Sequence, residues 1–148
     1  MAVRVQKADF DPGAELEALA AGDTDIGAVV SFTGLVRGTG GTRTMTLEHY
    51  PGMTEKALEA IEAEAHERWP LQASLVIHRI GPLAPGARIV LVATASRHRA
   101  AAFEAAEFLM DFLKTRAPFW KKEIAADGTA TWVDARESDD SAAARWAR

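Results

Sequence analysis

Cysteine is absent from this sequence of 148 residues. Its absence excludes disulfide bonds, thiolate metal sites and cysteine nucleophiles together. Long apolar runs are missing as well, since none approaches the roughly 20 residues that a membrane-spanning helix needs. The N-terminal stretch MAVRVQKADF has the features of neither a signal peptide nor a transit peptide. We therefore expect a cytoplasmic protein with no membrane partner.

Basic residues are fewer than acidic ones in this sequence. The chain has 17 lysines and arginines against 21 aspartates and glutamates, which gives a net charge of −4 and a pI near 5.6. General nucleic-acid binders are usually basic, so we expect no nucleic-acid partner. The composition, with 48% hydrophobic and 26% charged residues, is ordinary for a globular protein. The length predicts one domain over residues 1–148, with a polar C-terminal tail from about residue 135 to 148.

Motifs for metals and nucleotides are also missing. The four histidines show no HExxH or comparable spacing, so we expect no bound metal. The loop 37–43 is rich in glycine, but it has neither the GK[ST] end of a phosphate loop nor the GxGxxG spacing of a dinucleotide fold. We interpret it as a surface loop and expect no resident cofactor.

Apolar periodicity predicts alternating strands and helices, and their mixed order indicates an α+β fold with partly antiparallel strands. Asp11-Pro12 is typical of a helix start, and Asp127-Gly128 is typical of a hairpin turn. The expected strands are Val3–Lys7, Gly27–Val36, Thr44–Tyr50, Ser74–Ile80, Arg88–Ser96 and a hairpin over 122–134. The expected helices run from about Pro12 to Ala21, Thr54 to Arg68 and Arg97 to Arg116.

The stretch LKTRAPFWKKE, Leu113–Glu123, departs from the acidic composition, because it holds four basic residues and a single acid. Pro118 pushes the residue before it out of helical geometry, so the long helix should end near Arg116. Lys121 and Lys122 then start a strand on opposite faces, which directs one of them inward or toward a cleft. The stretch is therefore a candidate anion site.

The long helix that precedes this stretch has an apolar and a polar face. Its polar face ends with Lys114. An alternative interpretation is that Lys114 is an ordinary exposed lysine paired with Asp111. The expected core stripe is Phe103, Ala106, Met110 and Leu113, with Leu109 and Phe112 beside it.

The start of the same helix breaks a local rule. With Ser96 as N-cap, the first turn holds Arg97, His98 and Arg99, although the positive end of the helix dipole disfavours cations. Free backbone N–H groups at that end favour an anion, so these residues predict a second basic site. Arg37, which ends a buried strand, needs a partner or a ligand. The alternative for the three basic residues of the first turn is that they pair with carboxylates elsewhere. The alternative for Arg37 is that it is an ordinary solvated residue at a strand end.

Longer sequence motifs give a more specific prediction of the function. SFTGLVR, LEHYPGMTEKAL, VIHRIGPLAPG, ASRHRAAAFEA and FLMDFLKTRAPFWKKE, followed by WVDARESD, resemble the large, catalytic subunits of molybdopterin synthase, the MoaE family. The resemblance covers about Gly27 to Arg145, with the motifs in order and correctly spaced. It implies that family's α/β hammerhead arrangement, a mixed α+β domain that dimerises.

The resemblance also implies a reaction. This family converts cyclic pyranopterin monophosphate (precursor Z) to molybdopterin, and it takes the dithiolene sulfurs from the C-terminal Gly-Gly thiocarboxylate of a small, ubiquitin-like subunit. It implies Lys114 and Lys121 as catalytic residues, with Arg136 as a weaker candidate contributed across the dimer. The residues implied to bind the substrate are Leu35, Val36, Arg37, His98, Arg99, Lys114, Lys121, Lys122, Glu123 and Arg136.

Geometry adds one expectation about assembly. A helix from Arg99 to Lys114 spans roughly 22 Å at 1.5 Å per residue, so one chain cannot easily bring both basic ends into one small pocket. We therefore predict a site built across a homodimer, within a heterotetramer that includes two small subunits.

Two other functions remain open at this point. The chain could be a non-catalytic module that binds a phosphorylated metabolite or the partner's tail. It could also be a different enzyme on the same scaffold, acting on another cyclic phosphate or pterin. Substitution of the lysines separates these readings, because a binding module would lose affinity rather than turnover.

Overall fold

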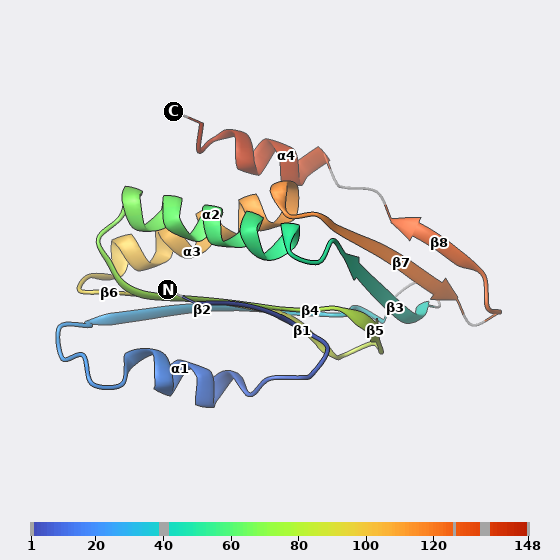
Figure 1. The fold of residues 1–148 in the computed structure, drawn as a ribbon, viewed down its shortest axis with the longest axis horizontal. Helices are drawn as coiled ribbons and strands as arrows, with labels where there is room; N and C mark the ends of the chain where they lie inside the picture. The colour runs from blue at the N-terminus through green and yellow to red at the C-terminus, as the bar shows by residue number, and fades with distance from the viewer. Residues whose placement is uncertain (1, 39–41, 126, 134–136, 148) are drawn as a thin grey trace.

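A computed structural model describes residues 2–38, 42–125, 127–133 and 137–147. It confirms the mixed α+β architecture, with two sheets and helices packed on the first of them (Figure 1). The elements are β1 (Ala2–Gln6), α1 (Pro12–Ala20), β2 (Ala28–Leu35), β3 (Thr42–His49), α2 (Met53–Arg68), β4 (Leu71–Arg79), β5 (Gly81–Leu83), β6 (Arg88–Ser96), α3 (Arg99–Arg116), β7 (Phe119–Ala125), β8 (Ala130–Val133) and α4 (Glu137–Ala144).

The first sheet has the strand order β1-β4-β6-β2. The β1–β4 pair is parallel, whereas β4–β6 and β2–β6 are antiparallel. Helices α2 and α3 cover one face of this sheet, and α1 covers the other (Figure 1). The second sheet, β5-β3-β7-β8, is antiparallel throughout and extends from one end of the first.

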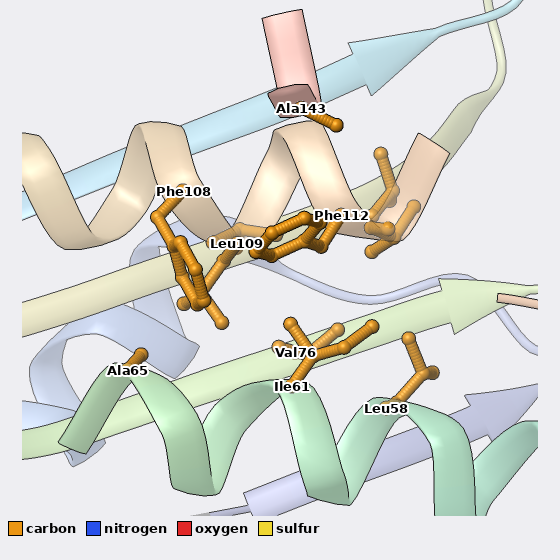
Figure 2. Close-up of a cluster of buried hydrophobic side chains, with 11 residues drawn as sticks. Leu58, Ile61, Ala65, Val76, Phe108, Leu109, Phe112 and Ala143 are labelled. Carbon is orange, nitrogen blue, oxygen red and sulfur yellow. The ribbon is translucent and has the colours of Figure 1, made fainter. Parts of the chain in front are cut away.

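Strand alternation divides the core into two layers around the first sheet. On β4, Val76 packs toward α2 and α3, while Leu75 and Ile77 pack toward α1. Figure 2 shows the larger layer, in which Phe108 and its neighbours on α3 face α2 and the sheet. A smaller cluster in the second sheet consists of Val36, Leu47 and Leu83.

Local signals explain most helix ends. Asp11 caps α1, because its Oδ1 accepts a hydrogen bond from the Ala14 N–H at 3.3 Å, and a proline occupies the first turn as predicted. The backbone of Ala117 is extended before Pro118, so α3 ends at Arg116 as expected. The end of α3 also meets the start of α2, where the Thr54 hydroxyl donates to the Pro118 carbonyl at 3.4 Å.

Two expectations about α3 are wrong. The N-cap is His98 rather than Ser96, because Ser96 remains in β6 and its hydroxyl donates to the Pro70 carbonyl at 2.8 Å. Of Arg97, His98 and Arg99, only Arg99 therefore lies in the helix. Phe103 is 60% exposed and does not belong to the core stripe, whose centre is instead Phe108. The buried residues of α3 are Ala102, Ala105, Ala106, Phe108, Leu109, Phe112 and Leu113.

Two elements were not expected. The segment Gly81–Leu83, which lies between two expected strands, forms β5 by pairing with β3, and such pairing between distant segments leaves no local signal. The expected polar tail contains α4, Glu137–Ala144. The residues that follow α4 attach it, since the Trp146 Nε1–H donates to Asp111 at 2.6 Å and the indole packs edge-on against Trp69 and Phe108.

Candidate active site

A cavity of about 720 Å³ lies where the two sheets meet the C-terminal end of α3. Its polar wall includes Arg37, which follows β2, Lys114 on α3, and Lys121 and Glu123 on β7. The other lining residues are Phe32, Thr33, Gly34, Leu35, Met45, His78, Ile89, Val90, Leu113, Ala117, Phe119 and Val133. The cavity thus gathers residues that lie far apart in the sequence, with three cations among them.

Strand β7 decides which basic residues face this cavity. Side chains alternate along a strand, so Phe119, Lys121 and Glu123 point to the cavity side. Lys122 points to the opposite face, where its ammonium lies 5.7 Å from the centre of the Trp132 ring. The structure therefore separates the adjacent lysines as alternation predicts, and it places Lys121 rather than Lys122 in the cavity.

The end of β2 forms the opposite wall. Gly34 is required there, because a Cβ at this position would lie 2.7 Å from Cγ1 of Val90. A bulge between Gly34 and Leu35 then turns the chain. Val36 is buried, and its N–H donates to the Ala87 carbonyl at 2.9 Å. Its side chain lies in the core of the second sheet, whereas Leu35 and the exposed Arg37 line the cavity.

Lys114 does not have the ion pair that its sequence position allowed. The carboxylate of Asp111 instead accepts from Arg145 at 3.0 Å and from Trp146 at 2.6 Å. Lys114 is exposed in the last turn of α3 and makes no ion pair within the described part of the chain. Its ammonium is therefore available to the cavity.

The remaining basic residues lie at the other end of α3. His98 lines a separate cavity of about 480 Å³, together with Pro70, Gln72 and Arg97. Arg99, also exposed, begins the helix beside it. The 18 residues of α3 give a length of about 27 Å. A single chain therefore does not bring the two groups together, and the dimer-built site stays a prediction. Arg136 lies outside the described residues.

Sequence reasoning missed His78, which lines the larger cavity from β4. It is buried, its ring stacks on Phe119 with centroids 3.8 Å apart, and its Nδ1 lies 2.8 Å from the Arg79 carbonyl oxygen. Burial is the main cause that lowers the pKa of His78 to about 4, and the charges of Lys121 and Lys114 add to the effect. The available signal was a histidine inside a strongly apolar strand.

Comparison with known proteins gives this arrangement a context. A family model described as "MoaE protein" matches residues 5–116. The chain belongs to the MoaE family. Among the relatives, the molybdopterin synthase catalytic subunit of Pseudomonas aeruginosa is 60% identical over 149 residues, which cover 99% of each chain. That of Rhizobium meliloti is 60% identical over 148 residues, which cover 99% of this chain and 96% of the relative.

Solved MoaE structures have the same fold. The molybdopterin biosynthesis MoaE protein from Burkholderia ambifaria is 54% identical, with a TM-score of 0.84 and coverage of 99% of this chain and 98% of that one. Molybdopterin synthase from Staphylococcus aureus is 36% identical, with a TM-score of 0.81 and coverage of 88% and 96%. These likenesses confirm the fold expected from the motifs. No helix in the described part of the chain has the length and apolar character of a membrane span.

Proposed function

We propose that this chain is the catalytic subunit of a molybdopterin synthase and converts cyclic pyranopterin monophosphate to molybdopterin. The sulfur comes from the C-terminal thiocarboxylate of a small, ubiquitin-like subunit. The observation that carries the proposal is the cavity at the end of α3, which combines Arg37, Lys114 and Lys121 on a chain 60% identical to synthase catalytic subunits.

The charges in the cavity suit both reactants. The substrate's phosphate and the partner's thiocarboxylate are anions, and guanidinium and ammonium groups bind anions through charge-assisted hydrogen bonds. The guanidinium of Arg37 presents several donors in a plane, which suits a phosphate. The two lysines approach from α3 and β7, so they can contact the reacting end of the substrate from two sides.

The reaction needs stabilisation of a leaving oxygen. The thiocarboxylate sulfur attacks the substrate and forms a carbon–sulfur bond, which joins the partner to the substrate as a thioester. Water then cleaves the acyl–sulfur bond, so the sulfur stays on the substrate and the partner's C-terminus becomes a carboxylate. Opening of the cyclic phosphate ester leaves negative charge on an oxygen. A fixed ammonium group of Lys114 or Lys121 stabilises or protonates that oxygen. The chain supplies no nucleophile in this scheme, which agrees with its lack of cysteine.

His98 and Arg99, at the start of α3, can join the lysines in one site only if a second copy of the chain supplies them. His98 and Arg99 lie a helix length away from the lysines of their own chain, so we assign them to the cavity of the partner subunit in a homodimer. Leu35, Glu123 and the lysines supply the rest of each site, with Val36, Lys122 and Arg136 as further candidates outside the described cavity lining. One small subunit docks at each end of this dimer, which gives a heterotetramer in the cytoplasm.

Reconstitution tests the function. Purified chain is mixed with precursor and with the small subunit, either thiocarboxylated or carrying an ordinary carboxylate. Molybdopterin should form only with the thiocarboxylated partner. The absence of product, when both proteins are folded and bound to each other, would refute the proposal.

Mixing two inactive variants tests the shared site. Lys114→Ala and Arg99→Ala should each abolish activity alone, while mixed dimers regain part of it because one of their two sites has both residues. Failure of every mixture to regain activity would indicate that each chain builds its site alone.

A further inference from the structure

The buried histidine of the cavity has a fixed orientation. The His78 ring is held on one side by the Phe119 ring, with an angle of 18° between the planes, and at one edge by the Arg79 carbonyl. A carbonyl oxygen only accepts hydrogen bonds, so Nδ1 carries the proton in this contact. In a neutral imidazole the other nitrogen, Nε2, then has a free lone pair for use as an acceptor.

The surroundings keep this imidazole neutral. The side chain is 4% exposed, and the basic groups that disfavour its protonation are Lys121 on β7, Lys114 on α3 and His49 on β3. Burial and these like charges all disfavour a protonated ring. The pKa of about 4 that results leaves the ring uncharged at neutral pH.

Strand geometry places Lys121 on the same face of β7 as Phe119, the residue stacked on this ring. Lys121 follows Phe119 by two residues on β7, so both side chains project from the same face. The ring stacked on Phe119 and the Lys121 side chain also line one cavity. A neutral acceptor can accept a hydrogen bond from an ammonium group and orient it without adding a negative charge.

We propose that His78 is a positioning residue of this site, whose neutral imidazole presents its Nε2 lone pair to Lys121 and directs the ammonium group into the cavity. The proposal rests on the proposed function for its role in turnover, but the tautomer and the proposed hydrogen bond to Lys121 can be tested on the chain alone. His78 acts through Lys121 and touches no reacting atom. Its effect is therefore expected on the chemical step rather than on substrate binding.

Two substitutions separate positioning from packing. His78→Phe keeps an aromatic ring for the stack on Phe119 and removes both nitrogens. His78→Gln loses the ring but keeps an acceptor near the position of Nε2. We expect His78→Phe to lower kcat about tenfold or more, as for loss of a hydrogen bond to a charged group, with KM unchanged. We expect His78→Gln to retain most of kcat. Equal losses in both variants, or full activity of His78→Phe, would overturn the proposal.

Spectroscopy on the unaltered protein tests the geometry without relying on activity or on the folding of a variant. Nitrogen-15 spectra of labelled histidine should show the Nδ1–H tautomer for His78 at neutral pH. The Nε2 resonance of His78 should shift when Lys121 is replaced in Lys121→Met. An Nε2–H tautomer, or an Nε2 resonance that ignores this substitution, would overturn the proposal. If the wild-type chain makes no molybdopterin but the spectra are as expected, the proposed function fails and the contact stands.

Discussion

Replacement of Lys114 by alanine should separate activity from stability. The side chain is exposed in the last turn of α3 and has no ion pair among the described residues, so the fold loses only its interaction with the helix dipole. That interaction is about 0.3–1 kcal/mol, and the better helix propensity of alanine offsets a few tenths of it. We expect the free energy of unfolding to change by less than about 1 kcal/mol.

The effect on turnover should be far larger. Removing one preorganised charge that stabilises a developing anion costs about 10²- to 10³-fold in rate. Molybdopterin formation under single-turnover conditions measures this loss, and denaturant unfolding measures stability on the same samples. Lys121→Ala should also lower the rate, whereas Lys56→Ala, an exposed lysine of α2, should not. Normal turnover by Lys114→Ala would show that this lysine is an ordinary surface residue.

Three further predictions concern the scaffold. Gly27→Ala should lower the free energy of unfolding by about 2 kcal/mol, because the new Cβ would lie 2.3 Å from the Arg97 carbonyl oxygen; Gly13→Ala, with its nearest contact at 3.4 Å, is the control. Trp146→Ala should lower the free energy of unfolding by about 3 kcal/mol, and hydrogen exchange in this variant should be faster in α4 than in α2. Equal exchange rates in the two helices would contradict the anchoring role of Trp146. Since the folded pKa of His78 is depressed from 6.5 to about 4, wild-type stability should fall as pH drops through this window, by about 3 kcal/mol in total. His78→Phe should lose that part of the pH dependence, and an unchanged slope would contradict the burial argument.

The order of most elements was predictable because their signals are local. The cap at Asp11, the break at Pro118 and the apolar runs of β4 and β6 each depend on residues close in sequence. β5 and α4 were missed because pairing with β3 and anchoring by Trp146 stabilise them, and both contacts come from distant segments. Phe103 was misplaced because helical periodicity alone does not fix which edge of an apolar stripe meets the sheet.

The site was predictable in its charges but not in its arrangement. Charge density and motif resemblance selected Arg37, Lys114 and Lys121, and the structure brings these three to one cavity. Helix length alone showed that Arg99 cannot join them within the same chain. His78 was missed because its one sequence signal, a histidine inside an apolar strand, is expected of a core residue as much as of a site residue.

The fate of the partner's C-terminus tests the central claim most directly. In one reaction, mass spectrometry follows the small subunit while molybdopterin is quantified. The dithiolene holds two sulfurs, so two thiocarboxylates should become carboxylates for each molybdopterin formed, and Lys114→Ala should slow both changes together. Molybdopterin made equally fast from precursor and inorganic sulfide, with the partner's thiocarboxylate unchanged, would contradict the account.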